Sequence, residues 1–196
     1  MEHQHFLIYK PYKMVSQFVT NDRHQKRKRF LGELADFPEG VMAVGRLDET
    51  SEGLLLITTD GKLSHQVNNS GKFNKEYYAQ VDGSITEEAI LTLRQGVDIS
   101  VNGKTYRTKP CEVKQLVNIP KLPQTDQKIR DDRHGPTSWI SIVLNEGKFR
   151  QVRKMTSAVG YPTLRLARAR IGNYSFEGMK CGEIIRLKAR LENISS

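Results

Sequence analysis

Polar and charged side chains that could do chemistry are concentrated in the segment 45–56, GRLDETSEGLLL. We expect a strand to deliver Arg46 and Asp48 to its end, where their spacing of two places them on one face, opposite Leu47. A carboxylate at such a position can attack a carbon atom as a nucleophile or stabilise a charged intermediate. An Asp that follows a strand more often caps the next turn, and the spacing alone favours that structural role.

No other group of residues forms a recognisable catalytic or metal-binding pattern by its spacing. His3 and His5 share a strand face but lack a third ligand nearby, and Cys111 and Cys181 are far apart in the sequence. Ser51 lacks the G-x-S-x-G turn of the α/β-hydrolases, and the chain contains no Walker A or GxGxxG sequence. The spacing therefore gives no sign of a zinc site, a hydrolase triad or a nucleotide-binding loop.

The charge of the chain points to a polyanionic partner. There are 31 Lys and Arg against 22 Asp and Glu, which gives a formal net charge of +9. Two windows, 10–30 and 145–170, each contain seven Lys or Arg and one acidic residue. Such clustering favours a nucleic-acid footprint over a generic positive surface.

The elements that must position these residues are mainly strands. Apolar, β-branched and aromatic runs predict strands at 5–10, 14–19, 41–47, 53–61, 76–83, 111–119, 137–144, 163–175 and 183–191. Residues 97–109 predict a hairpin that turns at Asn102-Gly103. Helical spacing predicts helices at 29–37, 62–69, 84–96 and 148–160. Ser84 and Glu87 have the spacing of a capping box at the start of the third of these helices. Strands joined by hairpins and interrupted by a few helices predict an α+β fold with a mixed or mostly antiparallel sheet.

Four segments resemble, in order, the motifs of the pseudouridine synthases, in particular the branch that modifies ribosomal RNA. They are YKPYKMVSQF, GRLDETSEGLLLITTDG, KEYYAQV at 75–81 and NEGKFRQVRKMTSAVGYPTLRLARARIG at 145–172. The resemblance extends over about residues 5–188, and four ordered motifs are far more specific than one short pattern. The chain departs from the branch at Tyr9 and Phe149, where Asn is usual, and at Tyr12-Lys13, where Gly is frequent.

The resemblance implies the isomerisation of uridine to pseudouridine in RNA, without a cofactor or a metal, on a fold with a central RNA-binding cleft. It places the nucleophile or charge stabiliser at Asp48, and leaves open attack on the ribose C1′, attack on the base, or a glycal-type elimination. It places at Arg153 the cation that would keep Asp48 ionised, since a nearby Arg lowers a carboxyl pKa by ~1–3 units. It places at Tyr77 the ring that would stack on a flipped uracil and help to remove its C5 proton. The alternative for Tyr77 is an inward-facing core aromatic.

We expect the catalytic domain itself to dock the RNA, because the resemblance begins near the N-terminus and no accessory RNA-binding domain precedes it. Arg46 would fill the space left by a flipped base or hold a flanking phosphate. Val152 resembles the position that packs on the target base. The residues expected to bind RNA are Lys10, Arg23, Lys26, Arg27, Lys28, Arg29, Arg46, Arg150, Val152 and Lys154. The partner implied is large-subunit ribosomal RNA, with transfer RNA or small-subunit RNA as alternatives. A non-catalytic RNA-binding or ribosome-assembly factor on the same scaffold is a further alternative.

The length of 196 residues fits one catalytic domain over 1–196, or two subdomains that share one sheet. Residues 120–136 contain three prolines and few apolar side chains, so we expect a mobile surface loop there. The N-terminus has no secretory signal, and no apolar run approaches the ~20 residues of a membrane helix. Two distant cysteines fit a reducing cytoplasm. Compactness and high charge favour a monomer.

Overall fold

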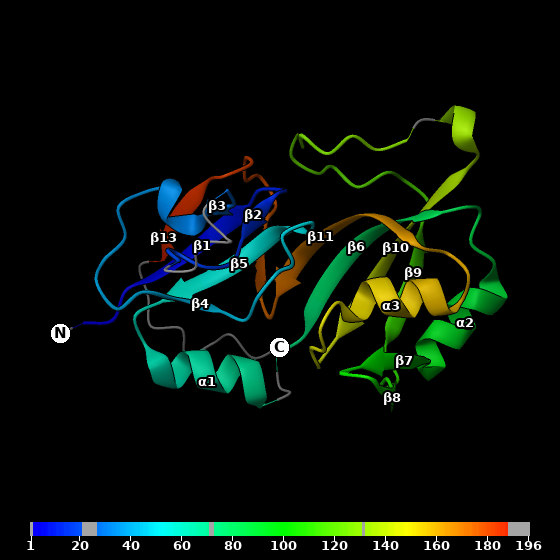
Figure 1. Ribbon diagram of the computed structural model, residues 1–196, viewed down its shortest axis with the longest axis horizontal. Helices are drawn as coiled ribbons and strands as arrows, with labels where there is room; N and C mark the ends of the chain where they lie inside the picture. The colour runs from blue at the N-terminus through cyan, green and yellow to red at the C-terminus, as the bar shows by residue number, and fades with distance from the viewer. Residues whose placement is uncertain (1, 21–26, 71–72, 131, 188–196) are drawn as a thin grey trace. The chain divides into compact units, whose positions relative to one another are not determined.

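The computed structural model describes residues 2–20, 27–70, 73–130 and 132–187 (Figure 1). The chain divides into two compact units. The first unit comprises Met1–Phe73, Pro123–Asp126 and Arg168–Ser196, and the second comprises Asn74–Leu122 and Gln127–Ala167. Both contain helices and antiparallel strands, which confirms the predicted α+β class. The assignment of the whole chain to one catalytic domain stays a prediction. No helix of the described residues is long and apolar enough to cross a membrane.

The first unit is built around the fully buried strand β5 (Glu52–Thr58). Strand β1 (His5–Lys10) pairs with it antiparallel, so that Ile8 lies opposite Leu55, and β13 (Ile184–Leu187) pairs with the other edge of β1. Strand β4 (Met42–Val44) also pairs with β5. The helix α1 (Gly61–Asn69) follows β5 along the chain. Two short strands, β2 (Met14–Val15) and β3 (Arg29–Phe30), form a separate parallel pair.

The second unit has β6 (Lys75–Asp82), β10 (Thr137–Leu144) and β9 (Glu112–Leu116) in antiparallel order. Its helices are α2 (Glu87–Gln95) and α3 (Gln151–Ala158), and their apolar faces share one core with the strands. The predicted hairpin forms from β7 (Asp98–Val101) and β8 (Lys104–Arg107). Asn102 and Gly103 at its turn both have positive φ, as a type I′ turn requires.

Strand β11 (Thr163–Ile171) belongs to both units. Its residues up to Ala167 belong to the second unit, where β6 is its neighbour, and those from Arg168 belong to the first, where β5 is its neighbour. Its end turns back through β12 (Tyr174–Ser175), which pairs at Arg170 and Ile171. A single strand therefore carries the arginine-rich sequence predicted for 163–175 into two different packing environments.

The predicted helix at 29–37 is wrong. Phe30 is extended, and only the short 3-10 turn η2 (Leu31–Glu33) follows it. The Leu31 side chain is fully buried and its N–H donates to the Gln17 carbonyl at 2.8 Å. Burial of Leu31 and pairing with the segment before it outweigh the weak local preference for helix in so short a segment.

The helix α2 begins two residues later than the capping-box spacing suggested. Thr86 is its N-cap, and its hydroxyl accepts a hydrogen bond from the Ala89 N–H at 3.2 Å. Glu87 and Glu88 lie in the first turn, where the helix dipole favours acidic side chains. The capping box at Ser84 and Glu87 was therefore the wrong pair in a correctly predicted helix.

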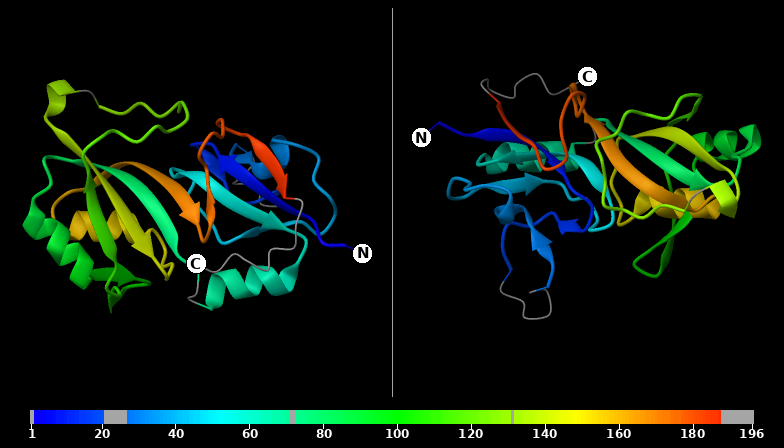
Figure 2. Two further views of the ribbon diagram at one scale, coloured as in Figure 1. Left: turned by 180° about the vertical axis from the view of Figure 1, so that it is seen from behind. Right: turned by 90° about the horizontal axis from the view of Figure 1, so that it is seen from above.

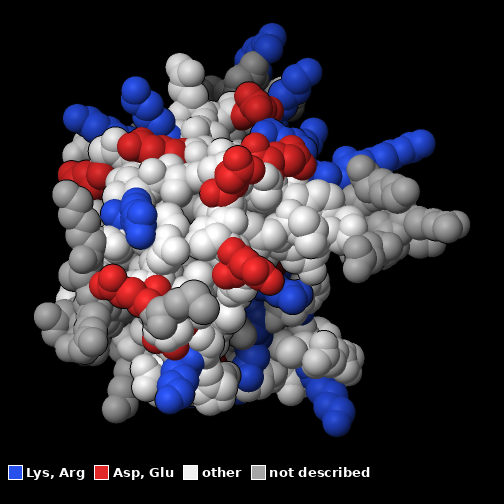
Figure 3. Space-filling model, turned by 90° about the vertical axis from the view of Figure 1, so that its left-hand side faces the viewer, with Lys and Arg blue, Asp and Glu red and all other residues white. Residues whose placement is uncertain are grey.

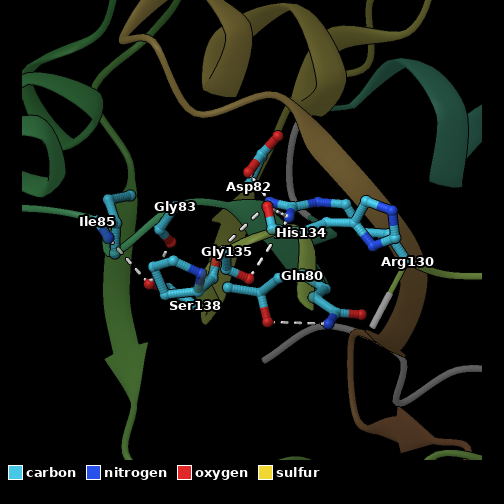
Figure 4. Close-up of polar contacts among 10 residues, drawn as sticks. Gln80, Asp82, Gly83, Ile85, Arg130, His134, Gly135 and Ser138 are labelled. Atoms are coloured by element: carbon cyan, nitrogen blue, oxygen red, sulfur yellow. Dashed lines mark hydrogen bonds and ion pairs between the residues drawn. The ribbon is translucent and has the colours of Figure 1, made fainter. Parts of the chain in front are cut away.

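The segment between β9 and β10 leaves the second unit's sheet as a long loop (Figure 2). It contains one short 3-10 turn, η3 (Asp132–His134), among its described residues. The Arg130 guanidinium, near the end of this segment, donates to the Asp82 carboxylate and to the carbonyls of His134 and Gly135 (Figure 4). Next to this contact, the Ser138 hydroxyl accepts from the Ile85 N–H and donates to the Gly83 carbonyl. The predicted mobility of residues 120–136 stays a prediction, and Arg130 anchors one end of them.

The first unit contains a fully buried lysine. Lys10, at the end of β1, has no exposed surface, and its ammonium donates to the carbonyls of Pro11 at 2.9 Å and Met14 at 2.5 Å. Burial lowers the pKa of Lys10 to about 7, and the carboxylates of Glu52, Asp48 and Glu49 oppose this while Arg168 adds to it. A native state that loses this proton near neutral pH is unusual for a lysine, whose ordinary pKa is near 10.4.

Replacing Thr86 with Ala should lower the free energy of unfolding by about 1 kcal/mol, because the Ala89 N–H in the first turn of α2 then loses its side-chain acceptor. Ser84→Ala is the matched control, and we expect it to change the free energy of unfolding by less than ~0.5 kcal/mol. Urea unfolding of both variants measures this. Equal losses in the two variants would contradict the assignment of Thr86 as the cap.

The free energy of unfolding should rise with pH between about 7 and 10, because the unfolded chain holds the Lys10 proton over that range and the native chain does not. The contribution of Lys10 has a slope of up to ~1.4 kcal/mol per pH unit. Lys10→Met should remove this contribution and flatten the profile, whereas Lys114→Met, at an exposed lysine on β9, should leave it unchanged. A Lys10→Met profile that parallels the wild-type one, measured by urea unfolding from pH 6 to 10, would refute the lowered pKa.

Candidate active site

Asp48 lies on a loop of the first unit, between β4 and β5. Strand β4 ends at Val44, so neither Arg46 nor Asp48 is on a strand as the sequence suggested. Gly45 breaks the strand with a φ of +72°, and the chain then exposes Arg46, buries Leu47 and half-buries Asp48. The predicted alternation of the three side chains is present, although the loop and not a strand produces it.

The buried Leu47 is held through its backbone. The Ser16 hydroxyl accepts a hydrogen bond from the Leu47 N–H and donates one to the Leu47 carbonyl, both at 2.9 Å. Immediately after it, the Ser51 N–H donates to the Asp48 carbonyl at 3.0 Å and closes a turn. Asp48 is thus fixed on both sides by backbone hydrogen bonds, which lowers the entropy that a reaction would have to remove.

Arg168 lies next to the strand that follows this loop. Its side chain is 1% exposed, and its Nε–H donates to the Leu54 carbonyl in β5 at 2.7 Å. A Cβ on Gly53 would lie 2.6 Å from the Arg168 backbone nitrogen, and a Cβ on Gly45 would lie 3.1 Å from Asn68 Oδ1 and 3.9 Å from Arg168 Nη1. The two glycines, both with positive φ, therefore permit the close packing of the loop and β5 against the buried arginine.

The electrostatic field around this loop is mixed. The carboxylate of Asp48 acts on Lys10, although burial has the larger effect on the pKa of Lys10. The ammonium of Lys28 pairs with the Glu49 carboxylate at 2.9 Å on the exposed side of the loop. The segment that contains Asp48 therefore has cationic neighbours, the buried Lys10 and the exposed Lys28.

Tyr77 lies in the second unit, on β6 opposite Ile142 of β10. It is half-buried and packs against the edge of the core that contains Val152 and Met155 of α3. Part of the ring remains exposed, so Tyr77 is neither fully in the core nor free of it. Tyr78, opposite Ser141, occupies the other face of the strand, as the alternation predicts.

Arg153 lies on α3 of the second unit and is half-buried. Its Nη1–H donates to the Thr163 carbonyl at the start of β11, at 3.2 Å. The Thr156 hydroxyl bonds to both the Arg153 carbonyl and the Thr163 hydroxyl, at 3.2 and 2.7 Å. The sequence placed Arg153 at the border of the apolar stripe of the helix, and its partial burial agrees with that placement.

The residues predicted to contact RNA differ in how exposed their side chains are. Arg27, Lys28, Arg29 and Arg46 are exposed, and Arg150 and Lys154 are half-buried. Arg23 and Lys26 lie outside the described residues. Lys154 donates to the Ser100 carbonyl at 2.6 Å, which ties α3 to β7.

Two of the predicted RNA contacts are wrong. Lys10 is fully buried and its ammonium is used by two backbone carbonyls, so it presents no charge to RNA. Val152 is 4% exposed and belongs to the core of the second unit. Arg168, which contributed to the basic window at 145–170, is also buried. Lys10 and Arg168 therefore contribute to the net charge but not to the basic surface.

The exposed side chains include more acidic groups among the basic ones than the net charge of the chain suggests. On the face shown in Figure 3, acidic side chains lie among the basic ones, and the basic side chains project mostly at the rim. Within the described residues no group of three His, Cys, Asp or Glu side chains is placed to hold a metal ion. The chemistry available at this loop is that of a carboxylate with cationic neighbours.

The sequence pattern missed the residues that hold Asp48 in place. Ser16 was part of a recognised motif without a role, and Arg168 was counted as a surface cation. A serine and an arginine so distant from Asp48 in sequence give no local signal of contact with its loop. The sequence predicts a strand at 163–175, but the alternation of Ala and Arg in LARARIG does not indicate that Arg168 is buried.

Similarity to known proteins supports the resemblance found in the sequence. The profile of the family described as RNA pseudouridylate synthase matches residues 4–158. A protein of Xanthomonas axonopodis pv. citri named ribosomal large subunit pseudouridine synthase E is 41% identical over 174 residues, which cover 88% of each chain. The protein of the same name from Vibrio vulnificus is 36% identical and covers 93% of this chain and 74% of its own.

Solved structures agree with these relatives. A crystal structure of a pseudouridylate synthase superimposes with a TM-score of 0.73 at 25% identity, and the match covers 95% of this chain and 70% of that one. A human protein, RNA pseudouridylate synthase domain containing 1, shares the fold with a TM-score of 0.53 at 16% identity, covering 93% and 78% of the two chains. From the matching profile, the sequence identity over most of the chain and the shared fold, we conclude that this chain belongs to the RNA pseudouridylate synthase family.

Proposed function

We propose that this chain converts a uridine of large-subunit ribosomal RNA to pseudouridine, with Asp48 as the group that attacks or stabilises the reacting sugar or base. The observation that carries the role of Asp48 is its half-buried position on a loop whose backbone is held by Ser16. The choice of RNA rests on the relatives named ribosomal large subunit pseudouridine synthase E, which match 88% or more of this chain.

The reaction requires one bond to break and another to form between the same two fragments. The N1–C1′ bond of the uridine breaks, the uracil turns while it stays bound, and C5 then bonds to C1′. The C5 proton leaves and N1 gains a proton, so no atoms are added or lost. Attack at C1′, attack on the ring, and elimination to a glycal all need an anion at this point, and Asp48 supplies it.

Tyr77 and Arg153 are proposed to act in the same reaction. The half-buried ring of Tyr77 can stack on an extruded uracil, and its hydroxyl can take part in the removal of the C5 proton. The guanidinium of Arg153 is proposed as the cationic partner of the Asp48 carboxylate. Extruding the target base costs a few kcal/mol, and exposed Arg46 can offset part of this by occupying the vacated space.

The exposed cations Arg27, Lys28 and Arg29 are proposed to follow the RNA backbone. Each neutralised phosphate releases counterions, so these contacts make the affinity depend on salt. Recognition of RNA through shape and unpaired bases needs few base-reading side chains, which agrees with a short basic segment of this kind.

Replacing Asp48 with Asn should reduce pseudouridine formation by roughly 10³-fold or more, because an amide has no charge with which to attack or stabilise the intermediate. RNA affinity should change by less than about threefold, since Asn keeps the shape of the side chain. Asp98→Asn, at an exposed acid on β7, is the control and should react at the wild-type rate. Mapping of pseudouridine in total RNA, from cells that contain each variant in place of the wild type, identifies both the product and the target RNA. A wild-type level of product from Asp48→Asn would refute the role of Asp48.

Changing Arg27, Lys28 and Arg29 together to Gln should weaken RNA binding and flatten its salt dependence. For single-stranded RNA the slope of log K against log salt should become less negative by up to ~2, which is about 0.7 for each lost phosphate contact. The matched control removes three exposed lysines elsewhere, Lys62, Lys114 and Lys180, and should leave the slope nearly unchanged. Fluorescence anisotropy between 50 and 300 mM salt compares them, and identical slopes for both triple variants would contradict the footprint.

A further inference from the structure

An exposed aromatic ring lies at the start of α3, outside the set of residues that the proposed reaction uses. The Phe149 side chain is 69% exposed. Among the described residues it is the only aromatic side chain in the group of large apolar residues that are exposed. Exposure of a phenylalanine forgoes the burial that normally stabilises it, but a single exposed apolar residue is common, so the surroundings of the ring decide what it can bind.

The loop that carries Phe149 is held rigidly by one carboxylate. Glu146 accepts hydrogen bonds from the Tyr106 hydroxyl at 2.5 Å, the Lys109 N–H at 3.0 Å and the Gln151 amide at 2.6 Å. The same Gln151 accepts from the Lys148 N–H at 2.9 Å, and its own N–H donates to the Lys148 carbonyl at 3.0 Å. The loop that carries the ring is therefore already ordered, so binding a ligand there requires little further loss of conformational entropy.

The backbone beside Phe149 also keeps the ring at the surface. Arg150 has a φ of 54°, the left-handed conformation that a non-glycine residue rarely adopts. This residue is the N-cap of α3 and provides no side-chain acceptor for the first turn of the helix. A strained residue held by the Glu146 network directs the chain so that Phe149 points away from the core of the second unit.

One cation lies over the ring, and others come from the same stretch of chain. The Lys154 ammonium lies 5.2 Å from the centroid of the Phe149 ring, and the Lys148 ammonium lies 4.7 Å from the centroid of the neighbouring Tyr106 ring. Arg150 and Lys109 add positive charge in the same loop region, and the carboxylate of Glu146 is turned inward to its three donors. A 69% exposed ring that has one ammonium over a face and others nearby matches a base with its phosphate better than it matches an apolar peptide.

We propose that Phe149 is a stacking site for an unpaired nucleotide of the RNA substrate, with Lys148, Arg150 and Lys154 holding the adjoining phosphates. The inference rests on the proposed function only in that the ligand is RNA. Stacking is tolerant of sequence, so this site adds affinity for single-stranded RNA next to the target without reading a base identity. A ring at this position gives this chain a contact that the asparagine usual in the family motif cannot provide.

A tryptophan placed at 149 reports stacking directly. Phe149→Trp keeps an aromatic surface, and its exposed indole fluorescence should be quenched on titration with a single-stranded oligouridine. The native Trp139 is 8% exposed and lies on β10, so the wild-type protein supplies the background signal. Saturable quenching of the variant beyond that background supports the proposal, whereas an unquenched indole under conditions where anisotropy shows bound RNA overturns it.

Removal of the ring tests its contribution to affinity. Phe149→Ala and Phe149→Asn should weaken binding of single-stranded RNA by roughly 5- to 100-fold, the range found when a stacking aromatic is lost. Phe149→Trp should bind like the wild type, and duplex RNA, which offers no unpaired base, should bind all the variants equally. Leu91→Ala, at an exposed apolar residue on α2, is the matched control and should have no effect. Equal affinity of the Ala variant and the wild type for single-stranded RNA, or an equal loss for duplex RNA, contradicts stacking.

The outcome is separable from that of the proposed reaction. In an Asp48→Asn background the protein should still lose affinity for single-stranded RNA when Phe149 becomes Ala, because binding does not require turnover. A protein that makes no pseudouridine but shows this loss would retain the stacking site while refuting the reaction. A protein that makes pseudouridine and binds single-stranded RNA equally well with Phe or Ala at 149 would refute the stacking site alone.

Discussion

The hydrogen bond from the buried guanidinium of Arg168 to the Leu54 carbonyl is the contact on which the geometry around Asp48 depends. Burying a guanidinium is costly unless its donors are used. The Nε–H of Arg168 joins β11 to the centre of β5, while its buried Nη2 has no hydrogen-bond partner among the described residues. Close approach of the two strands demands glycine at 53, where a Cβ would lie 2.4 Å from the Arg168 carbonyl oxygen, whereas the φ of +72° is what favours glycine at 45. Gly53 thus depends on a residue more than a hundred positions later, rather than on catalysis itself.

Much of the fold could be predicted from the sequence, because strand alternation, the Asn102-Gly103 turn and the periodicity of α2 and α3 are local signals. The helix predicted at 29–37 failed for a nonlocal reason, since Leu31 is drawn into the core and pairs with Gln17. The cap of α2 failed for a local one, since Thr86 and Ser84 have equally suitable hydroxyls and only the backbone conformation distinguishes them. Local patterns therefore locate elements better than they locate the ends of elements.

For the candidate site, too, local sequence patterns predict some of the residues and not others. Asp48, Tyr77 and Arg153 are predicted from motifs that are short and specific, and all three are half-buried in the structure. Ser16 and Arg168 could not be found, because each acts through a contact with backbone atoms distant in sequence. A catalytic side chain can be predicted from a sequence when its residue type is rare for its environment. A serine or arginine that supports a distant backbone segment cannot be predicted in this way.

Net charge overstated the surface available to RNA for a physical reason. A cation contributes to a nucleic-acid footprint only while it is solvated, and Lys10 and Arg168 are instead used inside the first unit to hold carbonyl groups. The pKa of Lys10 is lowered because burial penalises the charged ammonium, even though two carbonyl groups accept hydrogen bonds from it. The remaining exposed cations are fewer than the sequence suggests and lie among acids on at least one face. Affinity for a structured RNA must then come partly from contacts that are not purely electrostatic, and an exposed aromatic ring fixed beside lysines is the kind of contact that supplies it.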